Sequence, residues 1–195
     1  PNNPGVPPGY PRYARNLNAG ELRSYSDIPL TGTPKQFPVA LSQRLIHGYH
    51  ACVSYADRNI GVLLDALEKS GAAKNTIVVL WADHGWKLGD HSSWCKHTNF
   101  ECDTRVPLVI RHPRMKSVSG HSKALVELVD LYPTLCELCQ LDRPKHLQGK
   151  SLVPILKNPA ASHRDSAYSS YPHGRGKGQM PVVGHSIRTS RYRYT

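Results

Sequence analysis

Apolar residues between Pro38 and Lys69 recur at steps of three and four positions, which is the spacing of one face of an α-helix. Pro38 suits the first turn of such a helix. Gly71 follows the last periodic position and suits its end. The pattern therefore predicts one long helix over residues 38–69. Its apolar face is formed by Val39, Leu45, Ile46, Tyr49, Val53, Ala56, Ile60, Leu63, Leu64 and Leu67.

Two short runs further along the chain are apolar on both faces. They are TIVVLWA (76–82) and VPLVI (106–110), and both are rich in β-branched residues, as is typical of inner strands of a parallel sheet. Residues 123–141 predict a strand or turn followed by a short helix, with Asp130 as a cap and Pro133 in the first turn. Strands that alternate with helices indicate an α/β fold with a parallel sheet.

The two ends of the chain differ from this middle part. Seven prolines in residues 1–36 predict an extended lead-in that lies along the surface, because proline cannot continue a helix. Beyond residue 149 we expect a short helical turn and then an antiparallel sheet, whose last hairpin turns near residues 189–191. The expected parts are a lead-in (1–36), an α/β domain (37–149) and the start of a C-terminal subdomain (150–195).

The net charge of the chain indicates which classes of molecule it could bind. A formal net charge of +11 favours polyanions such as sulfated polysaccharide, nucleic acid or an acidic membrane surface, although a solvated basic surface is equally compatible. The basic residues are scattered, which argues against a nucleic-acid-binding arm. No apolar run approaches the ~20 residues of a membrane span, and no signal peptide is visible.

The five cysteines do not predict a disulfide framework, because their number is odd. Cys136 and Cys139 form a single CxxC with no second pair to complete a zinc site. We therefore expect them to be ordinary core thiols.

Titratable residues gather directly behind the first apolar run, in WADHGWKLGDHSSWCKH (81–97). Ligands of open α/β sheets bind at the carboxyl ends of strands, where Asp83 and His84 stand. A carboxylate oxygen suits Ca²⁺, and an imidazole extends the choice to Zn²⁺ or Mn²⁺. Lys96 could bind an anionic substrate beside such a metal, and His91 could donate to a leaving group or support Asp83. The alternative is a polar loop without a ligand.

The same stretch, continued as DHGWKLGDHSSWCKHTNFECDTRVPLVI, resembles the second hallmark block of the sulfatases, within the alkaline phosphatase superfamily. The helix and strand before it, LVELVDLYPTLCELCQL and LQGKSLVPIL after it, and the final GHSIRTSRYRYT resemble the family's neighbouring segments. The Asp-His pair, the Trp after Gly85 and the SIRT-x-x-YRYT ending point to the iduronate-2-sulfatase-like branch. The resemblance implies part of an alkaline-phosphatase-like mixed or parallel sheet flanked by helices, plus part of a small C-terminal antiparallel sheet.

The resemblance also implies roles for individual residues. Asp83 and His84 match two metal ligands, and the metal of sulfatases is Ca²⁺. Lys96 matches the lysine that contacts the sulfate ester. Trp86 and His97 match positions that line the substrate pocket.

His91 keeps its place in the block and is assigned with Lys96 to the catalytic residues, chiefly as a support for the ligands. Two positions depart from the family pattern. Asp90 replaces the usual Glu, and Ser92 replaces the usual Gly. These changes affect the turn and leave the ligands in place.

Three family features are missing from the sequence. They are the Cys-x-Pro-Ser-Arg motif whose Cys becomes the formylglycine nucleophile, the early Asp-Asp ligand pair and the Lys-Pro-His segment. We therefore expect a C-terminal part of a sulfatase, cut upstream of Pro1 and before the final strands, that is inert by itself. The resemblance implies a sulfated sugar or glycosaminoglycan as substrate and a secreted, periplasmic or lysosomal location.

Two alternatives stay open. One is a Zn²⁺- or Mn²⁺-dependent phosphatase or phosphodiesterase of the same superfamily. Such an enzyme needs a further distal His ligand, and His163, His173 and His185 stand in no context that we can match. The other is a non-catalytic basic module that binds polyanions.

Overall fold

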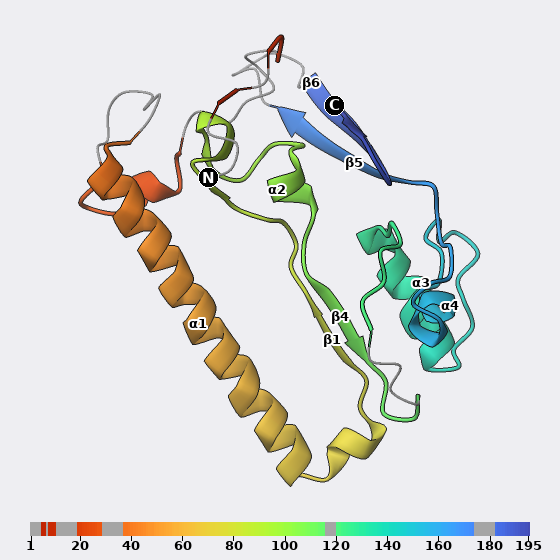
Figure 1. The fold of residues 1–195 in the computed structure, drawn as a ribbon. Coiled ribbons are helices and arrows are strands. Elements are labelled where there is room, and N and C mark those ends of the chain that lie inside the picture. The colour runs from red at the N-terminus through yellow and green to blue at the C-terminus, as the bar shows by residue number, and fades with distance from the viewer. Residues whose placement is uncertain (1–4, 7, 11–18, 29–36, 116–119, 174–181) are drawn as a thin grey trace. The chain divides into compact units, whose positions relative to one another are not determined.

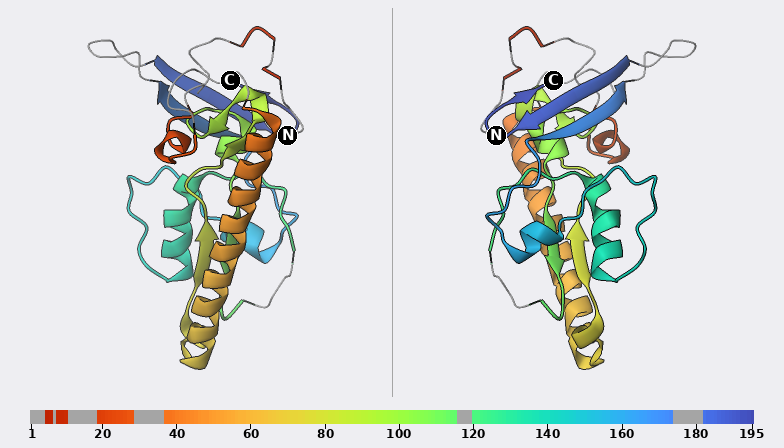
Figure 2. Two further views of the ribbon diagram at one scale, coloured as in Figure 1. Left: turned by 90° about the vertical axis from the view of Figure 1, so that its left-hand side faces the viewer. Right: turned by 90° about the vertical axis from the view of Figure 1, so that its right-hand side faces the viewer.

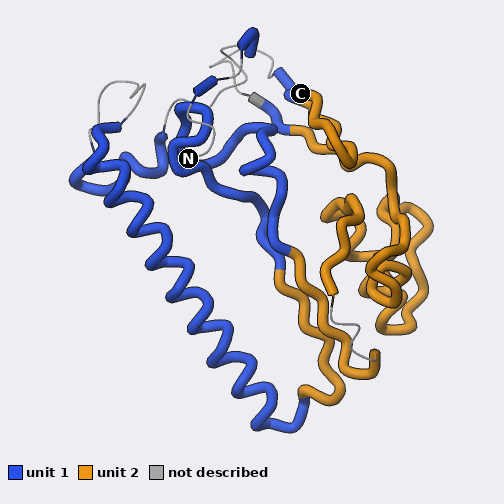
Figure 3. The backbone as a smooth tube through the Cα atoms, viewed as in Figure 1, with its two compact units in different colours: residues 1–72, 81–107, 171–184 blue, residues 73–80, 108–170, 185–195 orange. Residues whose placement is uncertain are grey.

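The structure is a computed structural model that describes all residues except 1–4, 7, 11–18, 29–36, 116–119 and 174–181. The chain divides into two compact units, each assembled from separate stretches (Figure 3). Unit 1 comprises residues 1–72, 81–107 and 171–184, and unit 2 comprises residues 73–80, 108–170 and 185–195.

Unit 1 contains one long helix and several short elements. In chain order these are the 3-10 helix η2 (Leu22–Ser24), α1 (Val39–Lys69), β2 (Lys87–Leu88), the 3-10 helix η4 (Asp90–Ser92), β3 (Trp94–Cys95) and α2 (Glu101–Thr104). The strands β2 and β3 pair in antiparallel register, with Lys87 opposite Cys95 and Leu88 opposite Trp94.

The predicted long helix is confirmed as α1, which runs unbroken over 31 residues (Figures 1 and 2). Pro38 precedes it, and Gly71 ends it with a φ of 76° while its N–H bonds to the carbonyl of Glu68. Every residue of α1 is described, and none is buried. Its first turns contact the core, because Leu41, Leu45 and Ile46 pack against buried residues of the same unit.

The core of unit 1 joins the lead-in to the loop that carries the candidate chemistry. Its buried members are Ala19, Leu22, Ile28, Phe37, Trp94 and Cys95. The rings of Phe37 and Trp94 lie 5.3 Å apart. Burial of each large apolar side chain is worth roughly 1.5–3 kcal/mol, so this cluster fixes the loop around Trp94. The lead-in was expected to be extended, whereas its described residues include the turn η2 and three of these core positions.

Unit 2 holds most of the remaining elements, and η3, β1, β5 and β6 each extend into both units. The elements are the 3-10 helix η3 (Ala72–Asn75), β1 (Val78–Trp81), β4 (Leu108–Arg111), the 3-10 helix η5 (Leu128–Asp130), α3 (Leu131–Leu138), α4 (Val153–Lys157), β5 (Ser166–His173), β6 (Val182–Thr189) and β7 (Arg193–Tyr194).

The two doubly apolar runs form β1 and β4, which pair in a two-stranded sheet. The chain runs along them in opposite directions (Figure 1), although their composition had favoured parallel neighbours. The side chains of Val78 and Val79 are half-buried, whereas those of Leu80 and Trp81 are exposed. This antiparallel pair is consistent with the mixed sheet that was expected from the sequence.

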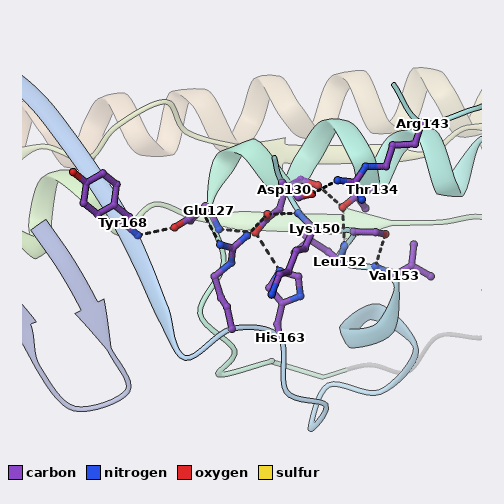
Figure 4. Close-up of polar contacts among 12 residues, drawn as sticks. Glu127, Asp130, Thr134, Arg143, Lys150, Leu152, Val153, His163 and Tyr168 are labelled. Atoms are coloured by element: carbon purple, nitrogen blue, oxygen red, sulfur yellow. Dashed lines mark hydrogen bonds and ion pairs between the residues drawn. The ribbon is translucent and has the colours of Figure 1, made fainter. Parts of the chain in front are cut away.

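A buried polar cluster ties the segment before α3 to the segment after α4 (Figure 4). The carboxylate of Asp130 is fully buried, and it accepts from the backbone N–H of Glu127 at 2.9 Å and of Lys150 at 2.7 Å. It also pairs with Arg164, and it lies 3.2 Å from Nε2 of His163. Asp130 was expected to cap α3, but its side chain instead closes a capping box with Glu127 around η5.

The predicted C-terminal sheet is confirmed with the strand order β5-β6-β7. The hairpin turn lies where it was expected, since the N–H of Thr189 donates to the carbonyl of Tyr192 at 2.7 Å and Arg188 faces Arg193. The expected Gly-rich loop between β5 and β6 lies mostly outside the described residues.

Of the helices that the structure describes, none has the length and apolar character needed to cross a membrane.

Candidate active site

Asp83 and His84 lie directly after β1, as their sequence position predicts. The backbone N–H of His84 donates to Asp83 Oδ1 at 3.0 Å. The Nδ1 atom of His84 lies 2.9 Å from the carbonyl oxygen of Gly85. A carbonyl only accepts, so Nδ1 carries a proton, and in the neutral ring Nε2 keeps a lone pair.

This tautomer is the one that a metal-binding histidine uses, with its other nitrogen donating to a backbone carbonyl. The free Nε2 lies 3.4 Å from Asp83 Oδ2, and the Asp83 side chain is 84% exposed. Two lone-pair atoms that face each other at this distance repel unless a cation or a proton lies between them. The pair therefore fits two ligands of one metal ion.

These two residues do not make a complete metal site. Within the part of the chain that the structure describes, no group of three or more His, Cys, Asp or Glu side chains is arranged to hold a metal ion. Further ligands are therefore needed for tight binding, since Ca²⁺ takes six to eight oxygens.

Gly85 is required here by a close backbone approach. A Cβ atom at this position would lie 1.8 Å from the carbonyl oxygen of Cys102. The N–H of Gly85 donates to the carbonyl of Asp103 at 2.8 Å. The residue after the candidate ligands is thus fastened to α2.

A buried ion pair holds the loop between β2 and α2. The Lys87 side chain is fully buried, and its Nζ lies 2.8 and 2.6 Å from the two carboxylate oxygens of Asp103. The backbone N–H of Thr98 donates to the same carboxylate at 3.0 Å, and its hydroxyl bonds there too. The charges of the pair are satisfied at both ends, which is the condition under which a buried ion pair is tolerated.

The loop itself is strained. Four non-glycine residues between β2 and α2 have positive φ angles: His91 (54°), Ser92 (54°), Cys95 (64°) and His97 (76°). Such conformations cost of order 1 kcal/mol each and persist where the surroundings fix them, most often at functional sites. The ion pair and the Trp94 core supply that fixation.

Lys96 and Trp86, assigned to the substrate contact, are neighbours in the structure. The ammonium of Lys96 lies 6.0 Å from the centre of the Trp86 ring and 3.0 Å from the carboxylate of Glu21 in the lead-in. The Lys96 side chain is 23% exposed, so solvent reaches it. A cation beside an aromatic ring in a half-buried position can bind an anionic group of a sugar.

His91 does not contact Asp83 in this structure. Its ring stacks on Phe100 with centroids 4.1 Å apart, and its Nδ1 lies 3.2 Å from the carbonyl oxygen of Gly5. Tyr10 stacks on the same Phe100 ring at 4.8 Å. The described contacts of His91 are therefore those of a residue that packs the loop against the lead-in.

His97 is held from β5. The hydroxyl of Tyr171 lies 2.5 Å from its Nδ1, and the two ring centroids are 5.3 Å apart. Two positions further on, the Asn99 amide donates to the carbonyl of Gly184 in β6 at 3.4 Å. The segment after Lys96 is thus attached to the C-terminal strands.

Burial raises the pKa values of three groups: the thiols of Cys102 and Cys95 and the hydroxyl of Tyr10. The pKa of Cys102 rises to about 11, first because the thiol is buried and then because of the charge of Asp103. Burial likewise raises the pKa values of Cys95 and Tyr10. These thiols stay protonated at neutral pH, so neither is suited to act as a nucleophile.

Sequence reasoning missed three partners of the site: Lys87 with Asp103, Glu21 with Lys96, and Tyr171 with His97. The first had a weak signal, because Lys87 stands between two apolar residues, Trp86 and Leu88. The other two had none, because 75 and 74 positions separate the members of each pair.

Two protein families match the chain over ranges that include these residues. The sulfatase family matches residues 5–141, and the family described as N-sulphoglucosamine sulphohydrolase, C-terminal, matches residues 89–195. The chain belongs to the sulfatase family. The sulfatase match includes Asp83, His84 and Lys96.

Individual sulfatases cover most of the chain. Iduronate 2-sulfatase of Homo sapiens is 29% identical over 98% of this chain and 45% of its own length. The structure of BT1596, a 2-O GAG sulfatase, has a TM-score of 0.72 at 27% identity and covers 83% of this chain and 35% of its own. The structure of BT4656 in complex with its substrate D-glucosamine-2-N,6-O-disulfate has a TM-score of 0.69 at 33% identity, over 80% of this chain and 33% of its own.

The chain spans less than half the length of each of these relatives. The structural neighbours confirm the expected fold class, an alkaline-phosphatase-like α/β sheet flanked by helices with a small C-terminal antiparallel sheet.

Proposed function

We propose that the protein carrying this chain hydrolyses sulfate esters of sugars. The observation that carries the proposal is the geometry of His84, whose Nδ1 meets the carbonyl of Gly85 while its Nε2 faces the exposed Asp83 carboxylate. A half-buried Lys96 follows twelve residues later in the same segment of the chain. This arrangement offers a cation site and an anion contact in the segment that matches the sulfatases.

The chain's own residues take distinct parts in this proposal. Asp83 and His84 would hold Ca²⁺, whose positive charge would stabilise negative charge on the sulfuryl oxygens. Lys96 would bind a sulfate oxygen. Its ammonium now pairs with the carboxylate of Glu21, so it would have to leave that carboxylate or contact both anions. Trp86 and His97 would line the sugar site, and His91 would keep the loop in place through Phe100.

The nucleophile lies outside these residues. None of the five cysteines is followed by x-Pro-Ser-Arg, and the thiols of Cys95 and Cys102 have raised pKa values. The 195-residue chain alone is therefore expected to give no turnover of an aryl sulfate in the presence of calcium. Turnover by this purified chain would contradict that expectation.

For the substrate we propose a 2-O-sulfated uronate at the end of a glycosaminoglycan chain. Two of the relatives act, by name, on iduronate 2-sulfate and on 2-O sulfate of a glycosaminoglycan. The net charge of +11 favours such a polyanion by raising its concentration near the surface. A secreted, periplasmic or lysosomal location follows from this substrate and can be checked by cell fractionation.

A direct test compares sulfate release with phosphate release by the full protein encoded by the gene. The substrates are a 2-O-sulfated uronate disaccharide and a phosphate monoester of the same leaving group, and bound metal is measured in the same preparation. We expect sulfate release and one calcium ion. Phosphate release with two zinc ions would support the phosphatase alternative, and heparin binding without either reaction would support the polyanion-binding module.

A further inference from the structure

Two tyrosines of β5 reach histidines in the same way. The Tyr171 hydroxyl lies 2.5 Å from Nδ1 of His97, and the Tyr168 hydroxyl bonds to Nδ1 of His185. The pairs differ in surroundings. Tyr168 is 55% exposed and His185 is exposed, whereas Tyr171 and His97 are half-buried. His97, the partner of Tyr171, directly follows Lys96 in the chain.

The backbone at His97 fixes where this ring can go. His97 has a φ of 76°, in the left-handed region, and the next three residues, 98–100, are buried. Thr98 is bonded to Asp103, and Asn99 is bonded to Gly184. With the main chain held on one side, the Tyr171 hydroxyl sets the rotation and the tautomer of the ring on the other.

We propose that Tyr171 is a positioning residue for substrate binding: its O–H donates a hydrogen bond to Nδ1 of His97, so the neutral ring carries its one N–H proton on Nε2. An Nε2–H can donate to a sulfate or carboxylate oxygen, and these oxygens only accept. The opposite tautomer would present a lone pair to an anion and repel it. This inference rests on the proposed function for its ligand, but the tautomer itself does not.

The first test is nitrogen NMR of the full protein labelled with [15N]histidine. In the wild type we expect His97 to show an unprotonated Nδ1 and a protonated Nε2. Tyr171→Phe keeps the aromatic contact and removes the hydroxyl, so the two nitrogen resonances of His97 should move toward each other as the ring samples both tautomers. Tyr168→Phe is the matched control, and it should shift His185 alone. A protonated Nδ1 on His97 in the wild type, or no shift in Tyr171→Phe, would overturn the proposal.

The second test measures affinity for a 2-O-sulfated uronate disaccharide by calorimetry. Loss of one hydrogen bond that orders the ring should weaken binding about fivefold in Tyr171→Phe and leave Tyr168→Phe unchanged. Equal affinities for Tyr171→Phe and the wild type would contradict the positioning role. If the wild type binds no sulfated sugar, the proposed function fails, while the NMR result still decides whether Tyr171 sets the tautomer.

Discussion

At the scale of single residues, the Lys87–Asp103 pair explains how a strained loop stays in place. Both side chains are at least 95% buried, and Thr98 adds two hydrogen bonds to the same carboxylate. Removing one partner of such a pair leaves the other charge buried without compensation. The positive-φ residues that follow depend on this anchor.

Lys87→Met should therefore destabilise the protein strongly, since it removes the charge and keeps the volume. We expect a loss of about 3–5 kcal/mol in the free energy of unfolding, measured by urea denaturation. Arg44→Met is the control, because its pair with Asp27 is more than half exposed on both sides, and it should cost less than about 1 kcal/mol. A Lys87→Met variant no less stable than Arg44→Met would refute the anchoring role.

The thiols provide a second residue-scale prediction. The pKa of Cys102 is raised from 9.0 to about 11, so the unfolded chain loses this proton first as pH rises. The contribution of Cys102 is thus constant below pH 9, and the free energy of unfolding should fall between pH 9 and 11. Cys102→Ser should reduce that fall, as measured by denaturation at pH 8 and pH 10.5. An identical pH dependence in wild type and Cys102→Ser would contradict the assignment.

The sequence identified the residues whose position along the chain reveals their chemistry. Asp83 and His84 were proposed because they follow an apolar strand, and Trp86 and Lys96 because they belong to a motif, and their roles stay predictions. Asp103, Glu21 and Tyr171 were not found, because their partners come from distant stretches that only the folded chain brings together. The expectation that both cysteines of the CxxC are core thiols is confirmed for Cys136, which is buried, and wrong for Cys139, which is exposed.

At the scale of elements, periodicity predicted α1 within one residue of its observed start and at its observed end. It did not predict how little of the apolar face is covered: Val39, Val53 and Leu63 are each at least half exposed. The direction of β4 relative to β1 was also beyond the sequence pattern, because a doubly apolar strand looks the same in either direction.

Close backbone packing in unit 2 gives an element-scale prediction. A Cβ atom on Gly149 would lie 2.0 Å from the carbonyl oxygen of Val129, next to the Asp130 cluster. Gly149→Ala should therefore displace Lys150, whose N–H bonds to Asp130, and lower the free energy of unfolding by about 1–3 kcal/mol. Gly61→Ala, in open space on α1, should raise it by up to about 1 kcal/mol. Similar changes for both variants, measured by thermal denaturation, would contradict this packing.

In the molecule as a whole, the loop between β2 and α2 links the candidate site residues to the N-terminal lead-in and to the C-terminal strand β5. Lys96 meets Glu21 of the lead-in, and His97 meets Tyr171 of β5. The relatives that the chain matches are more than twice its length. We therefore propose that this chain supplies part of a sulfatase site in which Lys96 contacts the anionic group of the substrate.

The most direct measurement is kcat/KM for release of sulfate from a 2-O-sulfated uronate disaccharide by the full protein and its Lys96→Ala variant. Removing a charge that stabilises the transition state should lower kcat/KM by about a hundredfold or more. Lys123→Ala, an exposed lysine of unit 2, should leave it unchanged. A Lys96→Ala variant that releases sulfate as fast as the wild type, or a wild type that releases none, would contradict this role of Lys96.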